Sequence, residues 1–334
     1  MGQHDAAFER EIAAYIGTPY ACGAASGTDA LLLSVLSLGI GAGDEVITHA
    51  NAFVAVVEAV QHAGAQPVLV DVAPDGFGPD PDAIACAITD RTKAVIVAHL
   101  YGSPVRLSRI EELTTRHGLV LIEDGSHAPG ASCGGRKVGS FGQIGCFSAG
   151  VVKNLGAYGD AGFITTADAD VVTRIRLLEG HGQEKKNAHV LYGFNSRLDE
   201  LQAAVLRVKL RYLDARNQRR RDIAAFYRER FSGLHVGVPS QKADEVPVYH
   251  QFVIRTAQRE RLQAHLEAAG IETGVHYPVP LHRQPAWLRH YGESPALPRA
   301  ERLAQEILSL PVFPDLTDAE VERVGDAVAG FFGA

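Results

Sequence analysis

One lysine of this 334-residue chain stands where its amine could become reactive. Lys153 follows the run CFSAGVV, which carries no charge, and it precedes Asn154 in a loop rich in glycine. A lysine usually lies on the surface with its ammonium group in water. Among small and apolar residues we expect desolvation to lower the pKa of the Lys153 amine, which would make it a nucleophile toward a carbonyl compound.

An aspartate and a histidine stand together at the end of a predicted strand. The run LVLI at 119–122 predicts a buried parallel strand, and Asp124 follows it where ligand crevices form. His127 comes three residues later, so both side chains could face one flat ring. A Schiff-base lysine and an aspartate that pairs with a pyridinium nitrogen are the two protein groups that pyridoxal 5′-phosphate (PLP) chemistry requires. Lys153 and Asp124 together therefore predict a PLP enzyme.

A glycine turn could bind the phosphate of such a cofactor. The run ASGTDAL at 25–31 enters a predicted helix, where free N–H groups and the Thr28 hydroxyl would form an anion pocket, although ordinary helix caps use the same residue types. Ser148, five residues before Lys153, offers another donor. Phe53 follows a predicted strand end and could stack on the cofactor ring, although a lone aromatic more often packs in a core.

The elements that must position these residues alternate between strand and helix. Strands are predicted at 45–48, 67–72, 94–98 and 119–122, and helices at 28–39, 51–63, 81–88 and 107–116. This alternation is typical of an α/β fold with a mostly parallel sheet covered by helices on both faces. Residues 145–148 and 162–165 predict two strands with no helix between them, so at least one strand should be antiparallel.

The second half of the chain predicts a smaller unit. A long helical pattern runs from Ser196 to residue 231, and we expect its cap at Asn195 or Ser196. A strand at 249–255 and helices at 259–269 and 318–332 follow. We therefore expect a large PLP-binding α/β domain at 1–205, and at 206–334 the connecting helix with a small C-terminal α+β domain.

Composition excludes several classes of protein. The hydrophobic content of 46% predicts a packed globular chain, and the net charge of -7 gives no broad attraction to nucleic acid or to an anionic membrane. No uncharged window reaches membrane-spanning length, and residues 1–17 contain no apolar signal core. The four cysteines form no C-x-x-C pair, so we expect a cytoplasmic protein with reduced thiols and no metal site.

Segments along nearly the whole chain resemble the PLP-dependent nucleotide-sugar aminotransferases of the DegT type, which have the aspartate aminotransferase fold (fold type I). In chain order these segments are SGTDAL, IEDGSHA, FSAGVVKNLGAYGDAG, GFNSRLDELQAAVLRVKL and VHYPVPLH. The lysine loop and the segment from Gly193 are the most specific of them in combination. Two positions depart from the family pattern, because Ala52 stands where threonine is common and Ala149 where a second aromatic is usual. The resemblance also places an N-terminal extension ahead of residues 8–17 that is not part of this sequence.

The resemblance implies a role for each candidate residue. Lys153 would form the internal aldimine and carry the proton, and Asp124 would pair with the pyridinium nitrogen. His127 stands where the family often has glutamine, near the cofactor ring and its phenolic oxygen. The other implied cofactor contacts are Gly27, Thr28, Asp29 and Ser148 at the phosphate, Phe53 on the ring, and Asn195 at the phosphate of the neighbouring subunit.

The Asn195 contact implies a homodimer with shared active sites. The resemblance also suggests contacts to the donor carboxylate, the sugar or the diphosphate, for which interface salt bridges and loop packing are the alternative roles: Arg197, His276, Tyr277 and His282. The implied activity is amino transfer from glutamate or glutamine to a keto sugar nucleotide through pyridoxamine phosphate. The run GAYGDAG at 156–162 resembles the branch acting at sugar C3, whereas TTGEGG is usual for C4, so we expect a dTDP-3-keto-6-deoxyhexose.

Other functions remain open on the same residues. A 4-keto-sugar or keto-cyclitol (scyllo-inosose type) aminotransferase would need the same cofactor contacts. The dehydratase branch has histidine in place of the lysine, so Lys153 argues against it. A non-catalytic regulatory homologue would have no need of a buried lysine. A metal enzyme is disfavoured, because His276 and His282 lack the ligand spacing of a zinc site.

Overall fold

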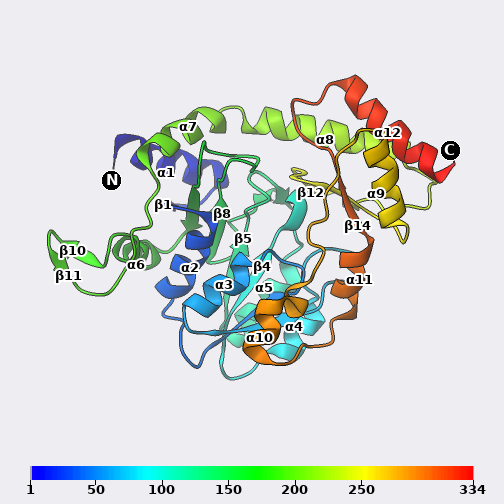
Figure 1. Ribbon diagram of the computed structural model, residues 1–334. Helices are drawn as coiled ribbons and strands as arrows, with labels where there is room; N and C mark the ends of the chain where they lie inside the picture. Colours follow the sequence, from blue (N-terminus) through cyan, green and yellow to red (C-terminus); the bar gives the residue numbers. More distant parts are fainter. Residues whose placement is uncertain (1, 334) are drawn as a thin grey trace.

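A seven-stranded sheet forms the centre of the computed structural model, which describes residues 2–333 (Figure 1). The strand order is β1-β9-β8-β5-β4-β2-β3. Strand β9 is antiparallel to both neighbours, and the remaining pairs are parallel, as the sequence predicts. The strands are β1 (Tyr20–Ala24), β2 (Glu45–His49), β3 (Gln66–Val70), β4 (Thr92–Ala98), β5 (Val120–Asp124), β8 (Ile144–Ser148) and β9 (Gly162–Thr166).

Helices cover both faces of this sheet, because its strands carry apolar side chains on both sides. Along β9, Phe163 packs into the cluster on one face and Ile164 into the cluster on the other. The helices of the Ile164 face are α2 (Gly27–Ser37), α3 (Ala55–His62) and α6 (Ala169–Glu179). Those of the opposite face are α1 (Gln3–Ile16), α4 (Pro81–Ala87), α5 (Ser108–His117) and α7 (Glu200–Leu210). The prediction of a helix–sheet–helix α/β fold is confirmed.

A second, smaller core lies beside the sheet. The antiparallel strands β13 (Phe252–Arg255) and β14 (Ile307–Leu310) pack with α8 (Leu213–Arg230), α9 (Arg259–Ala268) and α12 (Asp318–Phe332). Between the two strands the chain returns toward α3 and α4 (Figure 1), and Ala300 and Leu303 join the core of the large sheet. The domain division after residue 205 stays a prediction.

The remaining elements are short. Two further helices follow α9 before β14, α10 (Pro285–Tyr291) and α11 (Pro298–Glu306). The 3-10 turns are η1 (Leu100–Gly102) and η2 (Leu281–Arg283). The short strands are β6 (Ser132–Cys133), β7 (Arg136–Lys137), β10 (Gln183–Lys185), β11 (Ala188–His189) and β12 (Glu245–Val246). Across residues 2–333 no helix combines the length and the apolar character that crossing a membrane demands.

The prediction of one long helix beginning at Asn195 or Ser196 is wrong. The segment forms two helices, α7 and α8, with Arg211 and Tyr212 between them, and Asp199 is the N-cap of α7. Asn195 instead forms an antiparallel bridge with Gly180, and the N–H of Ser196 donates to the carbonyl of Glu179. This pairing keeps the backbone out of the helix until residue 200.

Candidate active site

Strand ends and a helix start meet around a cavity of about 380 Å³. The register pairs Ala98 at the end of β4 with Asp124 at the end of β5, and β8 ends beside them at Ser148. Because the carboxyl ends of parallel strands meet at one edge of the sheet, the loops after these strands line a common crevice. The residues predicted from the sequence that line it are Gly27, Thr28, Phe53, Asp124, His127, Ser148 and Lys153.

Lys153 is only partly exposed and lies in a tight turn, with its N–H donating to the carbonyl of Gly150 at 2.9 Å. Burial lowers the pKa of its amine below the ordinary lysine value, and the negative charge of Asp124 opposes this shift only in part. The lowered pKa predicted from the apolar run before Lys153 is confirmed. A lower pKa increases the share of neutral, nucleophilic amine.

Asp124 is the last residue of β5, and only 7% of it is exposed. Its Oδ1 accepts the N–H of Ser126 at 3.0 Å. The Ser126 hydroxyl in turn accepts the N–H of Ser148 at 3.0 Å, which ties the ends of β5 and β8 together. A buried carboxylate of this kind stabilises a protonated ring nitrogen beside it.

The start of α2 offers hydrogen-bond donors to the cavity. Ser26 is the N-cap, and its Oγ accepts the N–H of Asp29 at 3.0 Å. The N–H groups of Gly27 and Thr28 belong to the first turn, where an α-helix provides no intrahelical acceptor. A Cβ on Gly27 would lie 2.5 Å from the Cβ of Ser148, so only glycine lets the helix start approach the end of β8 this closely.

His127 is largely buried where it lines the cavity, and its Nδ1 accepts the N–H of Tyr101 at 3.2 Å. Burial lowers the pKa of its imidazole well below the ordinary value, and His250 and Lys153 lower it further. In a neutral ring whose Nδ1 accepts, the proton lies on Nε2. His127 is therefore a neutral hydrogen-bond donor.

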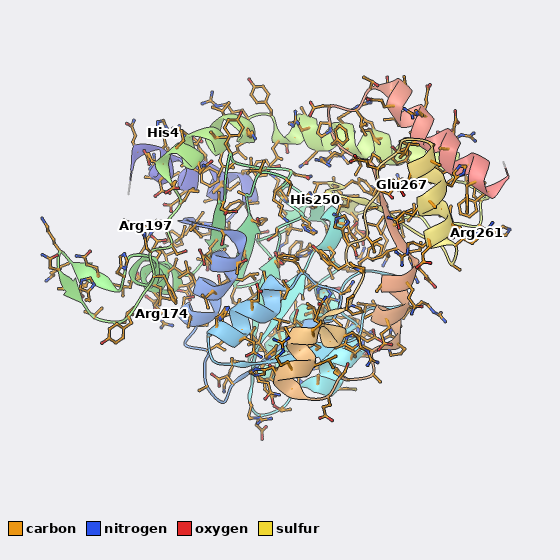
Figure 2. The ribbon with its side chains drawn as sticks, viewed as in Figure 1. His4, Arg174, Arg197, His250, Arg261 and Glu267 are labelled. Atoms are coloured by element: carbon orange, nitrogen blue, oxygen red, sulfur yellow. The ribbon has the colours of Figure 1, made fainter. Side chains whose placement is uncertain are left out.

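Some predicted residues lie outside the cavity. Asp29 does not line it, and its N–H donates to the Oγ of Ser26. Asn195 and Arg197 are exposed and bond each other, with Arg197 Nη2 2.9 Å from Asn195 Oδ1. Figure 2 shows Arg197 near α6, away from the interior position of His250.

The three candidates from the late motif differ in position. The Tyr277 ring lies 5.5 Å from the ring of Phe53, which lines the cavity, but Tyr277 itself is not among the lining residues. His276 is half-buried, and its Nδ1 lies 2.9 Å from the Ser309 hydroxyl. The His282 side chain is fully buried and its Nε2 lies 3.0 Å from Glu301, so it is not at the cavity.

Sequence reasoning missed Ser26, Ser126 and Asp160, all of which line the cavity. Ser126 stands between Asp124 and His127, so its place in that short run was a usable signal. Tyr101 gave no such signal, because its contact with His127 joins two separate loops.

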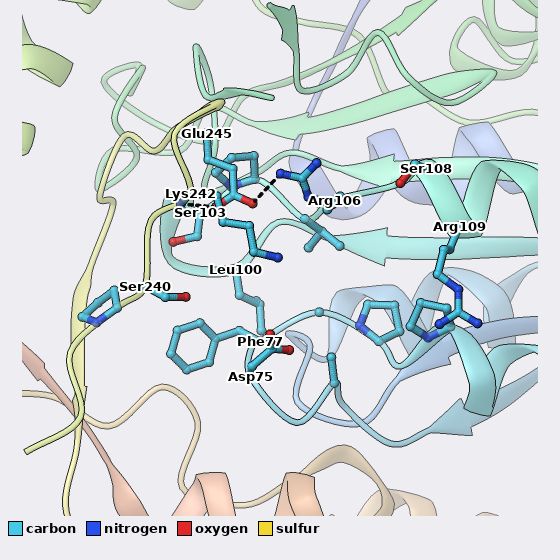
Figure 3. A pocket seen from close by; sticks show the side chains of 18 of the residues that line it. Asp75, Phe77, Leu100, Ser103, Arg106, Ser108, Arg109, Ser240, Lys242 and Glu245 are labelled. Atoms are coloured by element: carbon cyan, nitrogen blue, oxygen red, sulfur yellow. Dashed lines mark hydrogen bonds and ion pairs between the residues drawn. The ribbon is translucent and has the colours of Figure 1, made fainter. Parts of the chain in front are cut away.

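A larger hollow of about 500 Å³ lies on the other side of Leu100, between the loops after β3 and β4 and residues 238–245 (Figure 3). Its arginines already have partners: Arg109 is 2.6 Å from Asp82, and Arg106 bonds Asp244. It contains none of the residues predicted to bind the cofactor. The chemistry therefore belongs to the smaller cavity.

Comparison with known proteins identifies the family. The sequence profile of the DegT/DnrJ/EryC1/StrS aminotransferase family matches residues 1–329. The dTDP-3-amino-3,4,6-trideoxy-alpha-D-glucose transaminase of Streptomyces venezuelae is 44% identical over 332 residues, which are 98% of this chain and 87% of that protein. The UDP-N-acetyl-3-dehydro-alpha-D-glucosamine 3-aminotransferase of Acidithiobacillus ferrooxidans is 43% identical over 328 residues, 98% of this chain and 88% of that one.

A solved structure agrees with this result. The crystal structure of S. venezuelae DesV in complex with a ketimine intermediate superposes with a TM-score of 0.97 at 43% identity, covering 100% of this chain and 90% of that one. The cavity fits the cofactor of such enzymes, because it offers an amine for an aldehyde, a carboxylate for a ring nitrogen, and N–H and hydroxyl donors for a phosphate. The chain belongs to the DegT/DnrJ/EryC1/StrS aminotransferase family and is a PLP-dependent transaminase of fold type I.

Proposed function

We propose that this transaminase aminates a keto sugar carried on a nucleotide, at C3 of a 6-deoxyhexose on dTDP, with glutamate as the amino donor. The observation that carries the proposal is the meeting of Lys153, Asp124 and the start of α2 in one cavity. The names of both relatives above place the amino group at sugar C3, in agreement with the run GAYGDAG.

Each residue of the cavity has a separate proposed role in binding the cofactor or moving a proton. PLP, when bound, supplies an electron sink for charge that develops at the substrate carbon. Lys153 is proposed to bind the cofactor covalently and then to move the proton, for which a lowered amine pKa is suited. Asp124 would keep the ring nitrogen protonated, and His127 would donate through Nε2–H to the ring oxygen.

The phosphate would lie at the start of α2. The N–H groups of Gly27 and Thr28 point from a helix N-terminus, where the helix dipole favours an anion. The hydroxyls of Thr28 and Ser148 line the same cavity. Asn195 of a second copy is proposed to complete this pocket, and its exposure in one copy is compatible with that role.

Substrate contacts are proposed at the edge of the cavity. Phe53 would pack on the cofactor ring, and Tyr277, in contact with it, would border the sugar together with His276. Arg197 is proposed as a contact for a carboxylate or diphosphate, since a planar guanidinium binds such oxyanions in bidentate fashion.

We also propose a homodimer, because large apolar side chains are exposed in the lysine loop, where Val151 and Val152 line the cavity, and along residues 190–212. Val152 in the lysine loop is 78% exposed and Tyr192 is fully exposed, which is unusual for side chains of this size and kind on a monomer. The other exposed apolar residues in the same loop and on the neighbouring segments are Val151, Tyr158, Val190, Phe194, Leu201, Val208 and Tyr212. Covering them with a second copy would bring the partner to the mouth of the cavity.

Light scattering should show a dimer, or a multiple of it, at assay concentrations. Leu201→Asp places a charge in the exposed apolar set and should shift the protein toward monomer with loss of turnover, because burying an unpaired charge is costly. Leu288→Asp, on α10, changes an exposed apolar residue outside that set and should leave the mass unchanged. A fully active wild-type monomer would contradict the shared site.

A substrate panel tests the position of amination. We expect the enzyme to convert a dTDP-3-keto-6-deoxyhexose faster than the matched 4-keto compound and scyllo-inosose, with the aminated products identified by mass spectrometry. Glutamate and glutamine are compared as donors in the same assay. Exclusive use of the 4-keto sugar or of the inosose would refute the C3 assignment and leave amino transfer itself standing.

A further inference from the structure

His250 lies between β12 and β13, outside the residues assigned to the cofactor; it is only partly exposed, and Figure 2 labels it near the centre of the view. Its backbone is anchored from α8, because the buried side chain of Arg220 donates to the carbonyls of Tyr249 at 3.1 Å and His250 at 3.4 Å. Its side chain reaches in the opposite direction, toward the lysine loop. His250 Nδ1 lies 3.0 Å from the Oδ1 of Asn154, the residue that directly follows Lys153.

His250, Asn154 and Asn217 form a hydrogen-bond network, and the carbonyl of Pro129 determines which group donates in each of its bonds. The carbonyl of Pro129 can only accept, so the group 3.0 Å from it must be the amide nitrogen Nδ2 of Asn217, which donates to it. The Oδ1 of Asn217 therefore faces Asn154. The Nδ2 of Asn154 therefore donates to Asn217 at 3.0 Å and to the carbonyl of Val248 at 3.1 Å. That orientation leaves the Oδ1 of Asn154 as an acceptor, and His250 must present a protonated Nδ1 to it.

The same imidazole also contacts His127. The two rings lie 4.4 Å apart between centroids with an interplanar angle of 31°. Burial lowers the pKa of both imidazoles well below the ordinary value, and the charge of Lys153 acts on both in the same direction. Both rings are therefore neutral, and no charge repulsion opposes their contact.

We propose that His250 is a positioning residue for the amine of Lys153. It fixes the peptide that follows the lysine through Asn154, and it places the ring of His127 against the same loop. This role rests on the proposed covalent link between Lys153 and PLP. Because α8 and residues 248–250 carry the network, the position of the amine depends on the smaller core as well as on the sheet.

Two substitutions test separately the hydrogen bond that His250 donates to Asn154 and the contact that its aromatic ring makes. His250→Phe keeps an aromatic ring but removes the donor to Asn154. His250→Asn removes the ring, but its amide nitrogen can take the place of the protonated Nδ1. His265→Phe is the matched control, since His265 also packs on an aromatic ring, Phe331 at 5.4 Å, and makes one hydrogen bond, but lies in α9.

The main measurement is the rate at which visible absorbance of lysine-linked PLP appears after PLP is added to the apo protein. We expect His250→Phe to lower this rate and kcat by about tenfold, the size of effect when a buried acceptor loses its partner, with KM for the amino donor little changed. His250→Asn should stay within about threefold of wild type, because it restores the donor. His265→Phe should match wild type.

A wild-type rate in His250→Phe, or an equally slow rate in a folded His250→Asn, would overturn the proposal. If thermal unfolding shows that His250→Phe does not fold, Asn154→Ala removes the same hydrogen bond from the other side, together with those to Asn217 and Val248, and should slow linkage at least as much as predicted for His250→Phe. Where both single variants fold, the double variant should be no slower than the slower single variant, because both substitutions remove the contact between His250 and Asn154. A wild-type protein that never acquires the absorbance refutes the proposed function instead.

Discussion

Lys153→Ala is expected to abolish transamination and the visible absorbance of lysine-linked PLP. Proton transfer by a positioned side chain alone contributes about 10²–10⁴-fold to a rate, and the variant also loses the covalent link to the cofactor. Turnover followed with a saturating amino donor, and absorbance of the purified protein, measure the two losses separately. Lys153→Arg should be equally inactive, since a guanidinium retains the charge but is not nucleophilic.

The control for this prediction is Lys93→Ala, a change at an exposed lysine whose nearest carboxylate is Asp44 at 4.0 Å. Turnover and absorbance of that variant should equal those of wild type. The fold should survive Lys153→Ala, because the Lys153 backbone, and not its amine, makes the hydrogen bond to Gly150. Full turnover in Lys153→Ala would show that another group forms the link.

Asp124→Asn is expected to lower turnover by several orders of magnitude while the protein stays folded. The amide cannot stabilise a protonated ring nitrogen, so the cofactor would lose much of its capacity to accept electrons. Its oxygen can still accept the N–H of Ser126, the hydrogen bond that Asp124 makes at 3.0 Å. Asp124→Ala should be at least as slow, and KM for the donor should change much less than kcat.

Asp71→Asn is a matched control, because Asp71 is also buried and directly follows β3 of the same sheet, much as Asp124 ends β5. Its carboxylate accepts N–H groups of Arg299 and Ala300 at 3.0 and 2.8 Å and is not at the cavity. That variant should unfold at a lower temperature but retain its turnover when folded. If Asp124→Asn keeps near-normal turnover, the cofactor ring lies in another orientation.

The sequence alone was sufficient for groups whose setting is local. The uncharged run before Lys153 predicted its lowered pKa, and the apolar run before Asp124 predicted a carboxylate at the end of a buried strand. Strand and helix periodicity also predicted most of the sheet, including its antiparallel member. Strand ends and periodicity depend on neighbours a few residues away, which a linear pattern contains, whereas the burial that lowers the pKa of Lys153 comes from the folded cavity, because Val151 and Val152 of that run are themselves exposed.

Other features depended on contacts between distant segments. No sequence pattern indicated the break between α7 and α8. The bridge between Asn195 and Gly180 also shifts the start of α7 further along the chain. The late motif places Tyr277 against Phe53, which lines the cavity, but leaves His282 buried against Glu301, although both lie in one short run of sequence.

The tautomer of His127 and the anchoring of the lysine loop also required the tertiary structure. The first depends on the N–H of Tyr101, and the second on Asn217 and His250, all far from their partners along the chain. The physical reason is that a hydrogen bond has a direction, and its direction is set only when both partners have been placed by packing. Residue types and spacing therefore determined which chemistry is available, and the tertiary structure determined which groups donate, which accept and which are within reach.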